Sequence, residues 1–389
     1  MRDKLKLIQE AMDKAVDRKE IAGVNLLVNR HGEEIFYAQS GYADIDAGKK
    51  MDRDTICHLY SQSKPITAAA AMLLMQDGII DLNEPVENFF DSFKEQEYLE
   101  RGEKKKTTWD KRVRIFDLLN MTSGLVYPGE NTESEKATAI LFEDAIERLG
   151  SDNQMTTLEF ADKIGKIPLQ FMPGSSFQYG TSADVLGAVI EKVTGMKFGD
   201  FLKERLFDPL GMKDTAFFVP EDKKDRLSKV YEKNSDGNLS VFTGDHLIIR
   251  NDAGPNAFES GGAGLFSTLD DYMKFAQMLL AGGTYNGKEY MTKDTVRFFT
   301  SGALSKTQQK ALDNWQGLEG HTYGNLMRVM TSPEQALILG HKGEYGWDGW
   351  LGAYFMNDPE ADTTILMMTQ MRDYGTGHLT RRLRNIVLS

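Results

Sequence analysis

Apolar residues recur every three or four positions between Leu5 and Ala15, which predicts an amphipathic helix at the start of the chain. Two apolar-rich runs follow, Val24 to Val28 and Glu34 to Ala38, on either side of Arg30-His31-Gly32. This pattern predicts a β-hairpin and therefore the beginning of an antiparallel sheet. The segment from Ser61 to Asp77 has serines at its start, a proline in its first turns, an alanine-rich middle and a glycine directly after it. These features predict a helix.

The middle of the chain has a different pattern. From about Pro85 to Arg250 the helical period dominates, and proline and glycine turns separate the segments. The expected helices cover residues 114–120, 134–149, 157–164, 182–194 and 198–206. We therefore expect an all-α domain in residues 85–250, inserted into a sheet-and-helix domain made of residues 1–84 and 251–389.

The last third of the chain returns to strands. Strand character covers residues 261–266, 335–340, 352–357 and 363–371, and helices are expected at 268–280 and 378–388. Strands at both ends of the chain, with helices before, between and after them, predict an α/β fold of the α+β kind. Its antiparallel sheet would be flanked by the N- and C-terminal helices and interrupted by the helical domain.

Composition and charge narrow the choice of partners. The chain has 389 residues, 41% of them hydrophobic, and its 46 basic and 58 acidic residues give a net charge of −12. Such a surface repels nucleic-acid phosphates and anionic lipids, and no apolar run approaches the roughly 18 residues that span a bilayer. The only cysteine is Cys57, and the charged N-terminal segment is no export signal. We therefore expect a soluble cytoplasmic protein that acts on a small molecule, and a homo-oligomer stays open.

Several common catalytic designs are missing from the sequence. The six histidines have no HExxH or paired-ligand spacing, and no Gly-x-Ser-x-Gly nucleophile elbow occurs. The segment from Gly282 to Lys288 has P-loop spacing, but Glu289 stands where a metal-binding hydroxyl is needed. The glycines at 261–264 lack the spacing and the βαβ context of a dinucleotide site. No metal or cofactor is therefore expected.

Ser61-Gln62-Ser63-Lys64 is a Ser-x-x-Lys motif at the start of the expected helix. Residues three apart share one helix face, so the Lys64 amine can reach the Ser61 hydroxyl. A serine becomes nucleophilic when a neighbouring base takes its proton, and Lys64 can be that base if burial and the helix N-terminus disfavour its ammonium form. Tyr179 follows a Pro-Gly turn just before the helix expected at 182–194 and is a further candidate.

With these residues the sequence resembles the serine β-lactamase-like superfamily of class C β-lactamases, D-alanyl-D-alanine peptidases and family VIII carboxylesterases. The resemblance extends over nearly the whole chain through LLNMTSGL, PGSSFQYGTSADVLGAVIEKVTG, PLGMKDT, SGGAGLFSTLDDYMKFAQMLL and GWDGWLGAYFMNDP. It implies the β-lactamase/transpeptidase-like fold, with the active site between the two domains. It also implies Ser61, Lys64 and Tyr179 as catalytic residues, and the backbone N–H groups of Ser61 and Trp350 as the oxyanion hole.

Two family motifs are altered in this chain. Tyr179-Gly180-Thr181 occupies the place of Tyr-x-Asn, with a threonine in place of the amide. Two segments compete for the third motif, His341-Lys342-Gly343 and Trp347-Asp348-Gly349, and the spacing to Asp358-Pro359 favours the second. The resemblance therefore implies substrate-binding roles for Thr181, Trp347, Asp348 and Gly349, with His341 as the competing residue.

The third motif also bears on the substrate. A lysine at this place, as in lactamases, would pair with a substrate carboxylate, whereas Trp347 suits a neutral acyl group. We therefore expect a serine hydrolase that cleaves carboxylic esters through an acyl-enzyme on Ser61, without a cofactor. A β-lactamase, a D-amino-acid peptidase or amidase, an acyltransferase of the same superfamily and a binding module without turnover stay open, as does the choice of Lys64 or Tyr179 as the main base.

Overall fold

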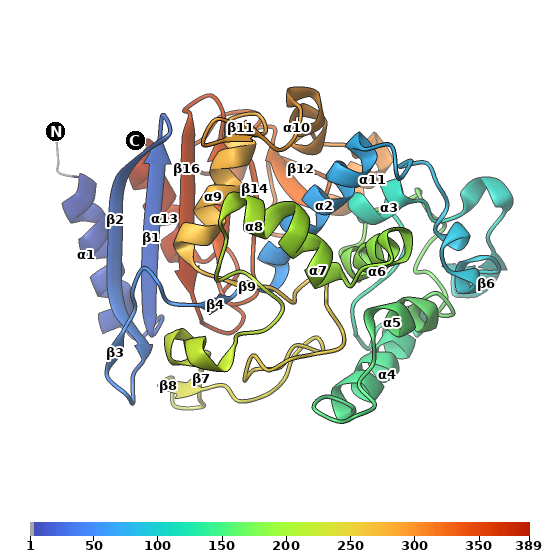
Figure 1. The fold of residues 1–389 in the computed structure, drawn as a ribbon, viewed down its shortest axis with the longest axis horizontal. Coiled ribbons are helices and arrows are strands. Elements are labelled where there is room, and N and C mark those ends of the chain that lie inside the picture. The colour runs from blue at the N-terminus through green and yellow to red at the C-terminus, as the bar shows by residue number, and fades with distance from the viewer. Residues whose placement is uncertain (1–3) are drawn as a thin grey trace.

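One eight-stranded antiparallel sheet organises the computed structural model, which describes residues 4–389 (Figure 1). The strand order is β12-β13-β14-β15-β16-β1-β2-β3. The sheet joins the two ends of the chain, because β1 (Gly23–Arg30) pairs with β16 (Thr363–Thr369), with Leu26 opposite Met367. The other strands are β2 (Glu33–Asp44), β3 (Lys49–Lys50), β12 (His321–Gly324), β13 (Met327–Met330), β14 (Tyr345–Asp348) and β15 (Tyr354–Asp358).

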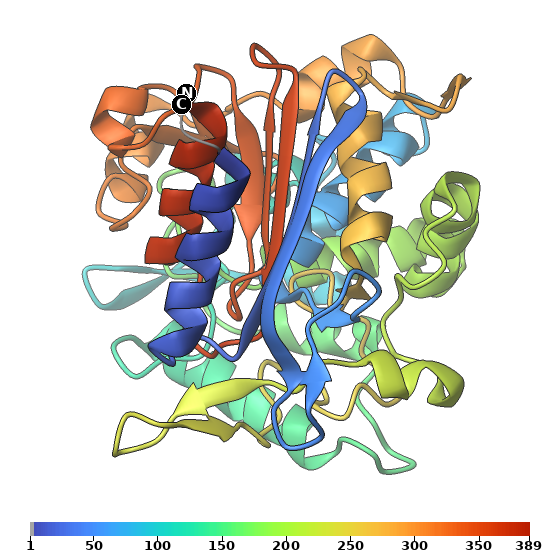
Figure 2. The ribbon, with the colours of Figure 1, turned by 90° about the vertical axis from the view of Figure 1, so that its left-hand side faces the viewer.

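Helices cover both faces of this sheet. α1 (Lys4–Asp17) and α13 (His378–Leu388) lie side by side on one face (Figure 2). They bury Ile8, Met12 and Leu383 in a core that they share with β1 and β16. α9 (Leu269–Leu280) packs on the opposite face against β15 and β16. The hairpin, the flanking helices and the antiparallel sheet predicted from the sequence are therefore confirmed.

The helical segments of residues 85–250 pack beyond α2 (Lys64–Gln76), away from the face of the sheet that α1 and α13 cover (Figure 1). α6 (Ser182–Thr194) contacts α2 and α5 (Thr157–Ile164), so α2 is buried between this segment and the rest of the molecule. The segment also holds α3 (Ile115–Leu119), α4 (Glu133–Glu147), α7 (Phe198–Leu202), α8 (Asp208–Leu210) and the hairpins β5–β6 (Glu97–Glu100, Glu103–Lys106) and β7–β8 (Tyr231–Lys233, Leu239–Val241). The division of the chain into two domains stays a prediction.

The remaining helices and strands are short. They are β4 (Cys57–His58), β9 (Phe266–Ser267), β10 (Thr284–Tyr285), β11 (Lys288–Glu289), α10 (Lys293–Phe299), α11 (Lys306–Leu312) and α12 (Pro333–Ala336). Over residues 4–389, no helix combines the length and the apolar character needed to cross a bilayer.

Two expected strands are wrong, and one expected helix is helical but only partly an α-helix. Residues 335–340 form no strand, because α12 ends at Ala336 and the next residue, Leu337, has a φ of 56° that breaks an extended run and a side chain that is 85% exposed. Within residues 261–266 only Phe266 belongs to a strand, since the glycines before it form a turn against α2 and α6. The helix expected at 198–206 is α-helical only over α7 and continues as a π-helix over Lys203–Phe207.

Candidate active site

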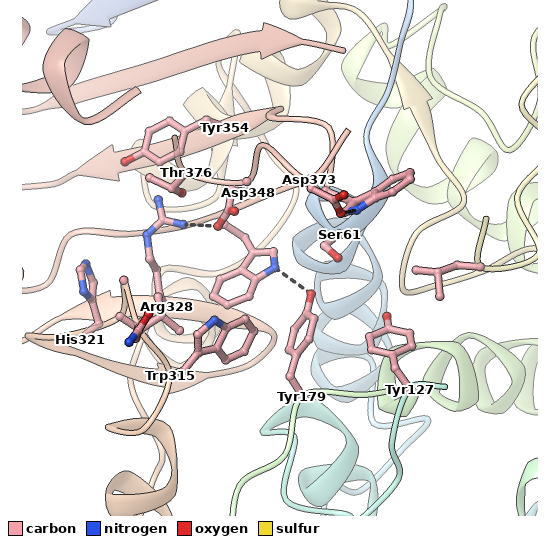
Figure 3. Close-up of a pocket in the computed structure, with 18 of the residues that line it drawn as sticks. Ser61, Tyr127, Tyr179, Trp315, His321, Arg328, Asp348, Tyr354, Asp373 and Thr376 are labelled. Atoms are coloured by element: carbon pink, nitrogen blue, oxygen red, sulfur yellow. Dashed lines mark hydrogen bonds and ion pairs between the residues drawn. The ribbon is translucent and has the colours of Figure 1, made fainter. Parts of the chain in front are cut away.

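Ser61 lies in a 3-10 turn and not in the helix expected there. The turn spans Tyr60–Ser63, and α2 begins only at Lys64. Tyr60 has a φ of 46°, a left-handed conformation that costs a bulky residue free energy and recurs at functional sites. The half-buried Ser61 side chain lines a cavity of about 1040 Å³ (Figure 3). The turn therefore presents the hydroxyl to the cavity while the following helix stays buried.

Lys64 lies behind Ser61 and is completely buried. Its Nζ atom is 3.2 Å from Ser61 Oγ, 3.0 Å from the Tyr127 hydroxyl and 2.8 Å from the backbone oxygen of Gly262. A neutral amine has two hydrogens and one lone pair. If the carbonyl and the tyrosine oxygen each accept one hydrogen, the lone pair faces Ser61, which is the orientation that a general base requires.

Burial also sets the charge of Lys64. Desolvation lowers the pKa of its amine from 10.5 to about 7, although the carboxylates of Asp184 and Asp348 act in the opposite direction. A large fraction of Lys64 is therefore neutral at neutral pH. Asp184 also accepts a hydrogen bond from the backbone N–H of Gly262 at 3.0 Å, so it fixes the turn whose carbonyl group holds the amine.

Tyr179 lies next to Ser61 and Lys64 and lines the cavity. Its hydroxyl accepts a hydrogen bond of 3.1 Å from Trp347 Nε1 and is also hydrogen-bonded to Ser61, and Lys64 Nζ lies 4.5 Å from the centre of its ring. Burial raises the pKa of Tyr179, which outweighs the opposing effect of these hydrogen bonds. The phenol is therefore protonated at neutral pH, and it can exchange a proton with Ser61.

The Trp347-Asp348-Gly349 segment lies at the cavity, at the end of β14. Trp347, Asp348 and Gly349 all line the cavity together with Ser61. A side chain at Gly349 would lie 2.2 Å from the backbone oxygen of Leu59, so only glycine allows this close approach to the Ser61 turn. The segment therefore occupies the place that the resemblance assigns to the third motif.

The two backbone N–H groups expected to form an oxyanion hole are available. Within residues 4–389, neither the Ser61 nor the Trp350 backbone N–H has a hydrogen-bond partner. The Trp350 side chain is held by Asp373, which accepts a hydrogen bond from Nε1 at 2.6 Å, and by His246, whose ring stacks on the indole at 4.0 Å. These contacts fix the backbone of Trp350 beside Ser61.

Two expected substrate-binding residues do not line the cavity. His341 lies in a loop after α12, where Nδ1 is 2.7 Å from Asp358 and Nε2 is 3.7 Å from Glu360. Thr181 is fully buried at the start of α6. The structure therefore brings together Ser61, Lys64, Tyr179, Trp347, Asp348, Gly349 and Trp350, and it leaves His341 and the Thr181 side chain outside this group.

Three residues of the site escaped the sequence reasoning. Tyr127 holds the Lys64 amine, Asp184 holds the Gly262 turn, and Arg328 on β13 forms an ion pair with Asp348 in the cavity wall (Figure 3). Tyr127 lies two residues after LLNMTSGL, one of the segments that carry the resemblance, and this proximity is the one signal that could have indicated it. Asp184 lies within another of these segments, PGSSFQYGTSADVLGAVIEKVTG, whereas Arg328 has no comparable signal, because its contact with Asp348 depends on the pairing of two strands.

The remaining walls of the cavity are mainly apolar and aromatic. Phe142 and Ile146 of α4 contribute on one side, Leu247 lies nearby, and Trp315 contacts both Tyr179 and Trp347. Such walls favour an apolar organic group, and the polar groups concentrate around Ser61 and around Arg328. The arrangement can activate a serine hydroxyl next to a hydrophobic binding space.

The chain is similar to several known proteins over most of its length. Esterase EstB of Burkholderia gladioli is 27% identical over 398 residues, which cover 98% of this chain and 94% of EstB. A putative D-alanyl-D-alanine carboxypeptidase of Salmonella typhi is 27% identical over 370 residues, or 89% of this chain and 78% of that protein.

The solved structures include "EstCE1, a hydrolase with promiscuous acyltransferase activity", which has a TM-score of 0.83 at 24% identity and covers 99% of this chain and 98% of its own. This likeness confirms the fold expected from the sequence. A family model described as Beta-lactamase matches residues 6–388. Since that match extends over almost the whole chain, the protein belongs to the beta-lactamase family.

Proposed function

We propose that this protein is a serine hydrolase that cleaves neutral carboxylic esters through an acyl-enzyme on Ser61. The observation that carries the proposal is the position of Lys64, whose buried amine lies 3.2 Å from Ser61 Oγ at the wall of the cavity. Burial lowers the pKa of this amine to about 7, so a neutral base is available without a cofactor.

The first half of the reaction follows from these positions. Lys64 takes the proton of Ser61, and Oγ attacks the ester carbonyl. The backbone N–H groups of Ser61 and Trp350 stabilise the negative oxygen of the tetrahedral intermediate. The proton then passes to the leaving alkoxide through Tyr179, whose phenol is hydrogen-bonded to Ser61. Water hydrolyses the acyl-enzyme by the reverse proton path.

Lys64 is the main base in this proposal, and Tyr179 transfers the proton. Burial has opposite effects on the two groups, since it favours the neutral amine of Lys64 and disfavours the tyrosinate form of Tyr179. At neutral pH a base is therefore present on Lys64, whereas Tyr179 holds its proton and can donate it.

An ester is supported as the substrate by the cavity and by one relative. Trp347 stands where a lysine would pair with a substrate carboxylate, and the indole N–H is directed to Tyr179. The walls next to it are aromatic and apolar. Among the relatives, EstB carries the name of an esterase at 27% identity.

The test compares the rates at which the protein cleaves three substrates, each of which releases a product that can be detected directly. We expect purified protein to hydrolyse a 4-nitrophenyl ester of a short neutral acid with a kcat/KM well above that for a chromogenic cephalosporin or a D-alanyl peptide anilide. Ser61→Ala should lose this activity. A kcat/KM for the cephalosporin or the peptide anilide equal to that for the ester would favour the lactamase or peptidase alternative, and a product ratio that changes with added alcohol would indicate acyl transfer.

Three further features belong to the proposal. We place the active site between a sheet-and-helix domain and a helical domain, and the support is that Ser61 and Trp347 line the cavity together with Phe142 of α4. A cytoplasmic location is supported by the single cysteine, Cys57, which is buried. Cell fractionation tests the location, and light scattering tests whether the chain forms a homo-oligomer.

A further inference from the structure

The cavity wall next to Ser61 contains a charged pair in the third motif. Asp348 Oδ1 lies 3.3 Å from Nη1 of Arg328, whose side chain is only 5% exposed, against 22% for Asp348. Arg328 also donates to the backbone oxygen of Phe355 at 3.4 Å, and its guanidinium lies 4.8 Å from the centre of the Tyr354 ring. Arg328 and Asp348 both line the cavity. The guanidinium is therefore held in a fixed position within reach of a bound ligand.

Asp348 is the member of the pair closer to the reacting groups. In Figure 3 its carboxylate lies between Ser61 and the Arg328 guanidinium. This carboxylate also raises the pKa of both Lys64 and Tyr179, which requires it to be near them. Burial raises the pKa of Asp348, whereas the charge of Arg328 and a hydrogen bond from Thr376 act in the opposite direction and favour the ionised carboxylate. An acyl group bound to Ser61 would therefore lie closer to the negative charge of Asp348 than to the positive charge of Arg328.

The ion pair between Arg328 and Asp348 is not needed to hold its two strands together. Arg328 and Asp348 lie on the neighbouring strands β13 and β14, which the backbone already joins, with Arg328 opposite Gly346. A buried arginine without a counter-charge would bind anions strongly, because a guanidinium pairs with a carboxylate by two parallel hydrogen bonds. In this protein the carboxylate of Asp348 pairs with Arg328 and so takes the place that an anionic ligand would otherwise have.

We propose that Asp348 determines the substrate specificity of this site: it neutralises Arg328 and thereby excludes esters whose acyl group carries a carboxylate. The inference rests on the proposed function and refines it, because it names the residue that restricts the site to neutral acyl groups. Without Asp348, Arg328 would turn the same wall into a binding site for a carboxylate.

The experiment uses two esters that differ in one charge. 4-Nitrophenyl hexanoate and mono(4-nitrophenyl) adipate have the same leaving group and acyl chains of equal carbon number, and only the adipate ends in a carboxylate. The readout is the ratio of kcat/KM for the adipate to kcat/KM for the hexanoate at one pH and ionic strength. Any change in the catalytic groups, including a shifted pKa of Lys64, acts on both esters and cancels in this ratio.

The wild type, the two single variants Asp348→Asn and Arg328→Gln, and the double variant form a double-mutant cycle. We expect Asp348→Asn to raise the ratio on the order of tenfold, which is the effect of one unpaired charge a few ångströms from the ligand in a partly solvated site. Arg328→Gln, which leaves the carboxylate unpaired, should lower the ratio by a similar factor. The double variant has no net charge change relative to the wild type, so its ratio should return toward the wild-type value.

The possible results distinguish the role of Asp348 from ester hydrolysis itself. Ratios that are equal in all four proteins, or that change in the same direction in both single variants, would overturn the role of Asp348 while leaving ester hydrolysis established. A wild type that does not hydrolyse the neutral hexanoate would refute the proposed function, and with it the inference that depends on it.

Discussion

The low pKa of Lys64 has a consequence for stability that needs no activity assay. In the unfolded chain this amine has an ordinary pKa of 10.5, and in the folded protein burial lowers the pKa to about 7. Between these two values the unfolded chain binds more protons than the folded protein. The wild-type protein must therefore gain stability as the pH rises through this window. Lys64→Met lacks the titrating group and lacks this gain.

The size of the effect follows from the two pKa values. At pH 7 the protonation of the unfolded chain lowers the free energy of unfolding by about 4 kcal/mol, and at pH 9.5 by about 1 kcal/mol. Relative to Lys64→Met, the wild-type protein should therefore gain about 3 kcal/mol between these pH values. The hydrogen bonds that Met cannot form to Tyr127 and Gly262 lower the stability of the variant equally at both pH values, so they cancel.

The assay is urea denaturation of both proteins at pH 7.0 and pH 9.5, followed by tryptophan fluorescence. Lys6→Met on the exposed face of α1, where the lysine side chain is 73% exposed, is the matched control for removing a surface ammonium. A wild-type minus Lys64→Met difference that stays constant between the two pH values would refute the reasoning. In that case the Lys64 ammonium is not disfavoured in the fold, and the amine cannot be the base at neutral pH.

Four further predictions concern catalysis. The kcat/KM of the wild type for a neutral ester should rise with pH through about 7, because protonated Lys64 cannot accept the Ser61 proton, and a flat profile down to pH 5 would contradict this. Tyr179→Phe should lower kcat by about 10² to 10⁴ in steady-state assays, and an unchanged kcat would remove its hydroxyl from the proton path. Trp347→Phe loses one hydrogen bond to Tyr179, so kcat should fall by up to about tenfold, and full activity would show that this bond does not position the phenol. Gly349→Ala places a methyl group 2.2 Å from the Leu59 carbonyl oxygen, so melting temperature and activity should both fall, and a normal protein would contradict the close packing of the third motif on the Ser61 turn.

The parts of the fold that the sequence predicts are those with a clear local period. The bounds expected for residues 157–164, 182–194 and 378–388 agree with α5, α6 and α13 as the structure has them. The helix expected at 268–280 is α9, which begins at Leu269, and the side chain of its N-cap Thr268 accepts the N–H of Asp271. In each case an apolar stripe and a local terminus signal decide the element, so no distant contact is needed.

The errors occur where distant contacts or exposure decide the structure. The apolar run at 335–340 has strand-like residues, but Leu339 is 46% exposed and its carbonyl oxygen accepts a hydrogen bond from Arg384 of α13. The Ser61 turn differs from the expected helix because the backbone of Leu59 and Tyr60 is fitted against Gly349 and the cavity. Hydrophobic periodicity carries no information about either contact.

Prediction of the site from the sequence is limited in the same way, because it succeeds for local contacts and fails for distant ones. Ser61 and Lys64 are three residues apart, so their contact follows from local geometry alone. Arg328 and Asp348 meet only because β13 and β14 pair, and Tyr127 reaches Lys64 from 63 positions along the chain. The sequence could therefore indicate the nucleophile and its base, whereas the residues that hold the base and set the charge of the cavity wall required the structure.

The most direct test of the central claim is intact-mass analysis after treatment with a fluorophosphonate probe, which labels activated serines. We expect one adduct on the wild-type protein, located at Ser61 by peptide mapping, and no adduct on Ser61→Ala. Labelling that persists in Ser61→Ala would contradict the assignment of the nucleophile.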